Sequence, residues 1–420
     1  MSSPVLFSNK LTLLILLAVD MTFAASAPQI STDNPSYQLH YSVDLLPQQN
    51  GANVQISIDN GELLQKIRFD NSSGIYSAIR ANGKLIIKGK EVFWELPPKD
   101  GKLNYFVKLN NERSPGKFDS RITKDWALFR GDDLIPPMQT VEVPNAYAIA
   151  ELQFNLPESW KSVETGWPRK KNNVFKIDNP ERLFDRPTGW IIAGKIGTRR
   201  ATINKTGISI SAPTGEGMRR MDALTYFNFV WPELDKAFRK SPQKLLVVGA
   251  GDPMWRGGLS AANSLFLHSD RPLVSENGTS PLLHELTHMV TRIRGVVTET
   301  ANDDWIAEGI AEFYSFELLY RAKGMTKSRR TNIIDGLAKW GENVAHLRKS
   351  KSTGAITARA VVLLDELDQE IRKRSKNKYN IDYVTRELMK QRKVSLDDLV
   401  AASEKLIGGK LEVLNSPLLK

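Results

Sequence analysis

A histidine pair four residues apart, followed at a distance by a glutamate, constrains this chain more than any other feature. The segment reads His284-Glu285-Leu286-Thr287-His288. Positions i and i+4 of an α-helix lie about one turn apart on one face, so both imidazoles can reach a single metal ion. The carboxylate of Glu285 is then held near an open coordination position, where it can deprotonate a water.

A third ligand is expected from a second helix that contains Trp305-Ile306-Ala307-Glu308-Gly309. Two histidines and one glutamate form the protein shell of a catalytic zinc, so we predict one Zn2+ per chain, bound by His284, His288 and Glu308. The alternative is a buried helix whose histidines only hydrogen-bond their neighbours. With 5 histidines in the whole chain, a chance occurrence of this motif is improbable, and we favour zinc.

The N-terminus has the pattern of a secretory signal peptide. Lys10 precedes an apolar run at residues 11–19, Asp20 interrupts the run, and small residues follow at positions 24–27. We therefore predict a signal peptide over residues 1–27, with cleavage between Ala24 and Pro28, and a secreted or periplasmic protein. Three Asn-x-Ser/Thr sites leave a eukaryotic secretory route open. The chain has 0 cysteines, which excludes disulfides, thiol catalysis and cysteine metal ligands.

The formal net charge of +11 comes mainly from late clusters at residues 321–330, 348–351 and 372–378. Such a surface could attract polyanions of the cell envelope, or it could be a solvated helix face without a partner. No nucleic-acid-binding motif accompanies the charge, so nucleic acid is not predicted as a ligand. The oligomeric state is left open.

Residues 28–200 show the pattern of a β domain. Segments 54–58 and 92–96 alternate apolar and polar residues, and the dipeptides Asn60-Gly61, Asn82-Gly83 and Asp100-Gly101 are typical of tight hairpins. We predict an antiparallel β-sandwich or open barrel.

From about residue 215 the spacing becomes helical. We expect a helix at 221–238, a short buried strand at 244–248, the motif helix at 282–293 with Ser280 as N-cap and Pro281 at its first position, and a ligand helix at 305–320. Ile356, Ala360, Leu363, Leu364, Leu367 and Ile371 form an apolar stripe that predicts another core helix. Ser395 and Asp398 mark the start of a last short helix.

Over about residues 180–405 the chain resembles the gluzincin metallopeptidases, above all the glycyl aminopeptidase family and its aminopeptidase N relatives. The segments that carry the resemblance are Leu183-Phe184-Asp185-Arg186-Pro187, Gly257-Gly258-Leu259 with Asn263-Ser264, the motif at 284–288, Trp305-Ile306-Ala307-Glu308-Gly309, and the helix around Leu363-Leu364-Asp365-Glu366-Leu367.

The resemblance implies an α+β multidomain fold: an N-terminal antiparallel β-sandwich-like domain (28–200), a thermolysin-like zinc catalytic domain (201–345) and a helical C-terminal region (346–420). It likewise implies that His284, His288 and Glu308 are zinc ligands, that Glu285 is the catalytic base, and that the substrate is a peptide or protein.

Two positions depart from the family pattern. The cleft strand of these aminopeptidases carries Gly-x-x-Glu, whose carboxylate binds the α-ammonium of the substrate. Here the strand reads Gly257-Gly258-Leu259-Ser260, so a hydroxyl replaces the carboxylate. A serine cannot offset the desolvation of an ammonium as an ion pair can. Specificity for a free amino terminus is therefore doubtful.

The second departure concerns the oxyanion. The family places Tyr-x-Lys-Gly before its C-terminal helix, and here the segment is Lys351-Ser352-Thr353-Gly354. Lys351 could donate to an oxyanion as a charge, or it could be one more solvated residue of the basic run. Tyr314, Tyr379 and Tyr383 are other phenols that could compensate.

Other polar residues have two interpretations each. Glu312, one turn after Glu308, could receive the outer N–H of a ligating histidine or could lie exposed on the helix. Asp303 and Asp304 are interpreted as helix-capping acids. His268 could line the substrate site, but a structural histidine is the favoured interpretation.

We thus predict a zinc metallopeptidase, acting as an endopeptidase or as an aminopeptidase of unusual specificity. The alternative is a catalytically impaired metallopeptidase fold that serves as a binding or scaffolding protein of the envelope. A third possibility is hydrolysis of another amide, such as that of a peptidoglycan stem peptide.

Overall fold

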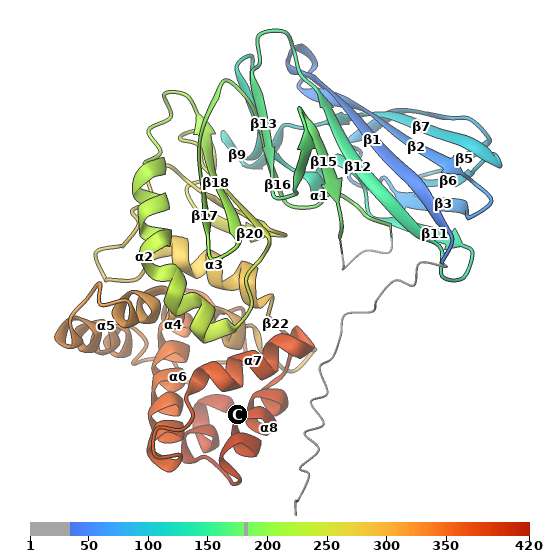
Figure 1. The fold of residues 1–420 in the computed structure, drawn as a ribbon. Helices are drawn as coiled ribbons and strands as arrows, with labels where there is room; N and C mark the ends of the chain where they lie inside the picture. Colours follow the sequence, from blue (N-terminus) through green and yellow to red (C-terminus); the bar gives the residue numbers. More distant parts are fainter. Residues whose placement is uncertain (1–33, 180–183) are drawn as a thin grey trace, which may run out of the picture. The chain divides into compact units, whose positions relative to one another are not determined.

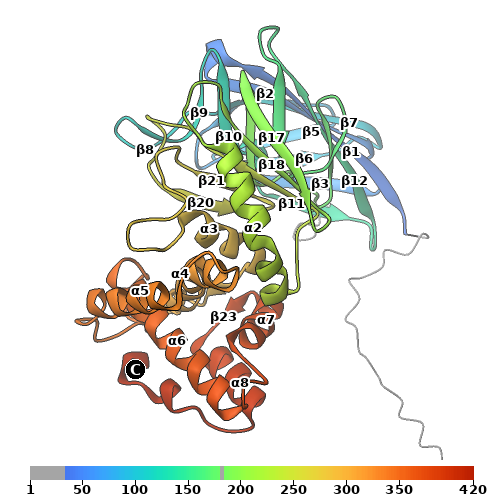
Figure 2. The same cartoon turned by 60° about the vertical axis from the view of Figure 1, so that its left-hand side comes forward.

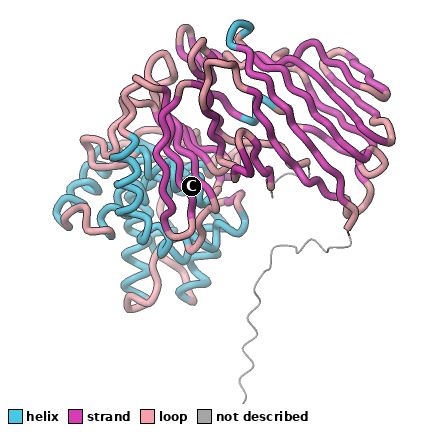
Figure 3. The backbone as a smooth tube through the Cα atoms, turned by 45° about the horizontal axis from the view of Figure 1, so that its top comes forward, coloured by secondary structure: helices cyan, strands magenta, loops and turns pink. Residues whose placement is uncertain are grey.

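The computed structural model describes residues 34–179 and 184–420 (Figure 1). The predicted signal peptide and Leu183 lie outside the described residues. Residues 35–420 form one compact unit. Strands predominate up to about residue 213 and helices after residue 220. Figure 3 shows most strands gathered in one part of the molecule and the helices in another. Within the described residues, no helix is both long and apolar enough to cross a bilayer.

Three β-sheets are formed by the described residues of the N-terminal half. The first sheet has the order β14 (Arg169–Lys171), β15 (Val174–Ile177), β12 (Tyr147–Asn155), β1 (Ser36–Leu46), β2 (Gly51–Asn60), β7 (Lys99–Lys108) and β4 (Tyr76–Ala81). The second sheet has the order β13 (Ser162–Thr165), β16 (Trp190–Gly194), β10 (Trp126–Arg130), β9 (Lys117–Ile122) and β8 (Asn111–Ser114). The third sheet has the order β11 (Met138–Glu142), β3 (Leu64–Asp70), β6 (Glu91–Glu95) and β5 (Lys84–Lys88). One apolar core, which includes Trp94, Phe129 and Phe154, joins them.

The prediction of a purely antiparallel sandwich is wrong in one respect. Strands β1 and β12, far apart in sequence, pair in parallel over Ser36 to Asp44. Alternation of apolar and polar residues predicts which face of a strand is buried, but it does not specify the direction of the partner strand. The first sheet is therefore mixed.

The three turn dipeptides were also misinterpreted as hairpins. The chain passes from the first sheet to the third at Asn60-Gly61 and at Asn82-Gly83. Asp100 and Gly101 lie inside β7, where Asp100 has a φ of 54°. The dipeptides do supply unusual backbone geometry, but they connect different sheets or distort a strand. The tight hairpin between β17 and β18 instead uses Asn204 and Lys205, with φ of 44° and 72°.

A fourth sheet, which we call the cleft sheet, begins the second half. Its order is β17 (Ile196–Ile203), β18 (Thr206–Pro213), β19 (Lys244–Val248), β21 (Ser264–Leu267) and β20 (Gly258–Ala261). Strands β18, β19 and β21 are parallel, and β20 is an antiparallel edge strand. The predicted domain boundary after residue 200 falls inside β17, and the domain division itself stays a prediction.

The predicted helices of the second half begin and end close to their expected positions, and two further helices, at 327–340 and 381–391, were not predicted. The helices are α2 (Arg220–Phe238), α3 (Pro281–Thr291), α4 (Asp304–Arg321), α5 (Lys327–Trp340), α6 (Ala355–Arg374), α7 (Ile381–Gln391) and α8 (Leu396–Ile407). Helix α2 packs on β17 and β18, and α4 lies between α3 and α6 (Figure 2). The stripe that predicted α6 is buried, apart from the partly exposed Ile356. Ser395 and Asp398 form the capping box that starts α8.

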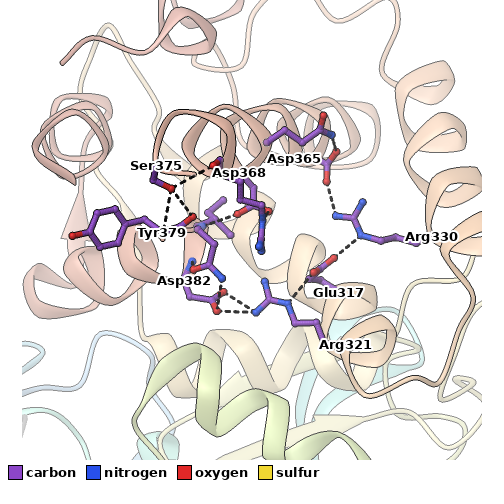
Figure 4. A network of polar contacts seen from close by, with 12 residues as sticks. Glu317, Arg321, Arg330, Asp365, Asp368, Ser375, Tyr379 and Asp382 are labelled. Carbon is purple, nitrogen blue, oxygen red and sulfur yellow. Dashed lines mark hydrogen bonds and ion pairs between the residues drawn. The ribbon is translucent and has the colours of Figure 1, made fainter. Parts of the chain in front are cut away.

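Part of the late basic charge points inward. Figure 4 shows a chain of ion pairs in which Arg321 contacts Asp382 and Glu317, and Arg330 contacts Glu317 and Asp365. All three acids are buried. Burying a charge is tolerable only when it is paired, so these arginines serve to join α4, α5, α6 and α7. They are not available to bind a polyanion.

Candidate metal centre

Helix α3 presents the motif histidines because its start is well defined. Ser280 caps the helix by accepting a hydrogen bond from the Leu283 N–H at 3.3 Å, and Pro281 occupies the first helical position. Both features are favoured at helix N-termini. Leu282, Leu283, Leu286 and the residues from Met289 to Thr291 are buried. His284, Glu285 and His288 are only half-buried, so they form the face that opens toward solvent.

Helix α4 contributes a matching stripe of acids. Asp304, Glu308 and Glu312 follow one another at i+4 spacing and are half-buried, while every residue from Trp305 to Ala307 and from Gly309 to Ala311 is buried. Residues at this spacing share one helix face. The stripe therefore faces α3, against which α4 packs.

The structure brings His284, His288 and Glu308 together. One ligand atom from each lies within 4.8 Å of the others. The Nε2 atoms of the two histidines are 3.1 Å apart, and they lie 3.4 Å and 3.5 Å from the Glu308 carboxylate oxygens. Ligands bound tetrahedrally to zinc at about 2.0–2.1 Å lie roughly 3.3–3.4 Å from each other. Donor chemistry and spacing thus both fit a zinc ion.

The electrostatics of these groups are strongly coupled. Burial lowers the pKa of His284, but the carboxylates of Glu308 and Glu312 outweigh it and raise the pKa to about 10. Burial raises the pKa of Glu308, yet the contacts with both histidines hold that pKa far below its usual range. A carboxylate that stays ionised beside two imidazoles is the arrangement that a divalent cation requires.

Glu312 lies where an outer partner of a metal-binding histidine is expected. Its Oε2 is 2.8 Å from Nδ1 of His284. With Nδ1–H donating to Glu312, Nε2 faces His288 and Glu308 and would become a ligand when a metal ion displaces its proton. The exposed-surface interpretation of Glu312 does not match this contact.

Glu285 contacts the edge strand of the cleft sheet. Its Oε2 accepts a hydrogen bond of 2.7 Å from the backbone N–H of Ser260 in β20. A Cβ at Gly258 would lie 2.9 Å from Cγ of Glu285 and 3.0 Å from Oε1, so only glycine leaves room for this approach. Gly257 is needed for another reason, because a Cβ there would overlap the Trp255 ring. Leu259 is held by the Trp190 indole, which donates to its carbonyl at 2.9 Å.

Lys351 does not join the cluster. Its side chain is exposed, and within residues 34–179 and 184–420 no hydrogen bond or ion pair holds it. Burial and the negative charge of Glu308 raise the pKa of Asp304, whereas the positive charge of Lys351 lowers it. The loop before α6 therefore lies near the first turn of α4. The charge of Lys351 thus influences the Asp304 carboxylate, although no contact holds the Lys351 side chain in one position.

The candidate tyrosines lie elsewhere. Tyr314 is fully buried, and its hydroxyl donates to Asp382 at 2.7 Å. The rings of Tyr379, just before α7, and Tyr383, in its first turn, meet edge to face, and Tyr383 is 37% exposed. Tyr314 therefore cannot replace the missing oxyanion donor.

His268 is a buried histidine in the loop after β21. Its Nδ1 accepts a hydrogen bond from the Asp270 N–H at 3.2 Å, and its backbone N–H donates to the Gly257 carbonyl at 3.0 Å. Burial lowers its pKa. These contacts support the structural interpretation of His268, which fixes the start of the cleft strand.

Three features of the site were not predicted from the sequence. Asp303 does not cap α4 through its side chain; its carboxylate binds Arg348 at 2.6 Å and 3.1 Å. Asp304 shares the face of Glu308, which its i−4 spacing could have revealed. The contact between Ser260 and Glu285 has no sequence signal, because it depends on how β20 packs over α3.

The fold is shared with solved structures of zinc metallopeptidases. An aminopeptidase N family protein from Idiomarina loihiensis is similar with a TM-score of 0.60 and 16% identity, over 84% of this chain and 70% of that one. The M1 zinc metallopeptidase from Deinococcus radiodurans and a mutant of it give TM-scores of 0.54 and 0.55, each at 15% identity over 92% of this chain and 94% and 93% of theirs. The sequence matches no family model and no curated protein. The likeness establishes the aminopeptidase N type of fold and nothing specific to glycyl aminopeptidases.

Proposed function

We propose that this chain is a secreted or periplasmic zinc metallopeptidase of the gluzincin type. The observation that carries the proposal is the convergence of His284, His288 and Glu308, whose ligand atoms lie within 4.8 Å of one another. A zinc site of two histidines and one glutamate leaves a coordination position for solvent. Glu285 lies beside that cluster, on the open face of the same helix.

The chemistry follows from the roles of these residues. Zinc, when bound, supplies Lewis-acid polarisation of the scissile carbonyl and acidifies water. Glu285 accepts a proton at its carboxylate as water attacks the peptide carbon, and it returns the proton to the leaving amine. Glu312 fixes the tautomer of His284 through its contact with Nδ1. The N–H of Ser260 orients the Glu285 carboxylate.

The edge strand β20 offers a surface for an extended peptide. It pairs with β21 on one side only, so the backbone groups of its other edge that do not bind Glu285 or Trp190 can pair with a substrate strand. At position 260 this strand carries a serine, which cannot neutralise an ammonium group. We therefore propose cleavage that does not depend on a free amino terminus, as in an endopeptidase.

Turnover is expected to be slow. Removing one oxyanion donor typically costs about 2.7–4 kcal/mol, or a hundred- to thousandfold in rate. Lys351 stands where the family has its tyrosine, but its exposed and unpaired side chain is poorly fixed for this role. Position 351 of the proposed enzyme therefore supplies no preorganised phenol.

The deciding experiment uses the mature protein and a matched pair of peptides, one with a free amino terminus and one N-acetylated. Glu285→Gln is expected to retain zinc but to lose about 10²–10⁴-fold in hydrolysis, the usual contribution of a general base. Glu387→Gln, an exposed pair partner on α7, is the matched control and should remain active. Unchanged hydrolysis by Glu285→Gln would refute the mechanism, and cleavage of the free peptide alone would refute the proposed independence from the amino terminus.

A binding or scaffolding role is the second candidate. Ser260 and Lys351 motivate it, since both replace residues with which the aminopeptidase families bind substrate or stabilise the oxyanion. Zinc bound at full occupancy without hydrolysis of a diverse peptide library would favour this candidate. Hydrolysis of a peptidoglycan stem peptide, but of no other peptide, would favour the third possibility, that the same residues cleave another kind of amide.

A further inference from the structure

A second charged cluster lies away from the metal centre, where edge strands of three sheets meet. Glu164 in β13 is 1% exposed and accepts a hydrogen bond of 2.8 Å from Arg169 in β14. Arg200 in β17 donates to the same carboxylate oxygen. The ammonium of Lys244, at the start of β19, lies 3.7 Å from the other oxygen.

The charges in this cluster do not balance. Three cations share one carboxylate, so two positive charges remain in excess. The Lys244 side chain is only 15% exposed; its ammonium also donates a 3.0 Å hydrogen bond to the Trp167 carbonyl and lies 5.7 Å from the centre of the Phe175 ring. Burial lowers its pKa to about 8, Glu164 counteracts this, and the two arginines lower the pKa further. Partly buried cations without counter-charge are costly, and a bound anion removes that cost.

Arg200 has the free donors that such an anion needs. Its side chain is 58% exposed, and in the described ranges 34–179 and 184–420 Glu164 is its only hydrogen-bonding partner. A guanidinium has five N–H donors in a planar fork, so most of them remain available to a ligand. This geometry suits oxyanions, which accept two parallel hydrogen bonds from one arginine.

We propose that Arg200, Lys244 and Arg169 form a binding site for a doubly charged tetrahedral oxyanion, such as phosphate or the phosphate group of a monoester. A dianion would balance the two excess charges, with Arg200 as its solvent-facing donor. Arg169 would contribute its charge, because its terminal nitrogens already donate to the carbonyls of Asn172 and Val163 and to Glu164. The site joins the strand edges of the first, second and cleft sheets, so occupation would also stabilise their junction. It is independent of the proposed peptidase activity.

Calorimetric titration of the full mature protein tests this site. Sodium phosphate and glucose 6-phosphate are titrated separately at pH 7 and constant ionic strength, so that a free ion and a phosphate group on a larger molecule are distinguished. Wild-type protein is expected to bind saturably, and Arg200→Gln at least tenfold more weakly. The matched control is Arg68→Gln, whose guanidinium pairs with a single carboxylate, that of Glu91, on the third sheet.

Lys244→Met is a second variant, expected to weaken binding by a similar factor. If Lys244→Met does not fold, the comparison of wild-type protein with Arg200→Gln still tests the proposal, because Arg200 is exposed. Binding of both ligands supports the site with a phosphate group as the recognised element, and binding of inorganic phosphate alone supports it for the free ion. Absence of saturable binding by wild-type protein, or equal affinities for wild-type and Arg200→Gln, would overturn the proposal.

Discussion

Gly258 shows how one missing side chain positions the proposed catalytic base. Its backbone does not require a positive φ, so alanine would be tolerated there but for the neighbouring Glu285 side chain, whose Cγ and Oε1 lie 2.9 Å and 3.0 Å from the new Cβ. Gly258→Ala should displace Glu285 and reduce kcat by about 10²-fold, the usual effect of misplacing a reacting group by about 1 Å. Steady-state kinetics measure this, with Gly336→Ala as control, since a Cβ there meets nothing within 4 Å. A variant as fast as wild type would show that Glu285 needs no such space.

Asp185 gives a pH dependence of stability that does not involve the metal ligands. Burial raises its pKa to about 7, against the lowering effect of a hydrogen bond from the Asn179 N–H. An unfolded chain releases this proton near pH 3.9, so the stabilising contribution present below that pH is lost as the pH rises through 7. Asp185→Asn should therefore gain stability relative to wild type, on the order of 2–4 kcal/mol, between pH 4 and pH 8.

Urea unfolding of both proteins at several pH values checks this prediction, since titration of the metal ligands affects the two equally. A stability difference that does not change across this range would contradict it.

How much of the site is predictable depends on the range of each contact. The positions of His284, His288 and Glu285 follow from helix periodicity alone, because all three lie within two turns. Glu308 was predicted as a ligand from the motif that contains it, because helix geometry does not relate it to the histidines of another helix. The Ser260 N–H could not be found, since it is 25 residues from Glu285 and no side chain is involved.

At the scale of elements, helices were predicted well because their signals are local. Ser280 with Pro281, and Ser395 with Asp398, mark helix starts within one turn. The three segments predicted as strands, 54–58, 92–96 and 244–248, fall on β2, β6 and β19. The direction of strand pairing could not be predicted, because pairing joins residues about a hundred positions apart, as between β1 and β12. An Asn-Gly dipeptide indicates the local backbone angle φ. It does not indicate which sheet the next strand joins.

The ion-pair chain between helices α4 to α7 can be tested by removing its central acid. Glu317 is 4% exposed and contacts both Arg321 and Arg330. Glu317→Gln removes the negative charge shared by two half-buried guanidinium groups, which should cost about 3–5 kcal/mol. Urea denaturation followed by circular dichroism measures the loss, and Glu387→Gln on the surface of α7 should change stability by less than about 0.5 kcal/mol. Equal stability of the two variants would show that solvent replaces the lost carboxylate.

At the scale of the whole molecule, the β-rich first half and the helical second half were both anticipated, and the mixed first sheet was not. The contact between Trp190 and the Leu259 carbonyl ties the second sheet to the cleft strand. The two halves therefore position the site jointly, which composition and periodicity cannot reveal. The likeness to aminopeptidase N structures, which spans 84–92% of the chain, is consistent with this arrangement.

The most direct test is X-ray absorption spectroscopy at the zinc edge on the purified mature protein, together with its metal content. We predict one zinc per chain with two imidazole nitrogens and oxygen ligands at about 2.0–2.2 Å. Glu308→Ala should lose most of the metal. A protein without stoichiometric zinc, or a zinc whose coordination is unchanged in Glu308→Ala, would contradict the assignment of these three residues to one metal ion.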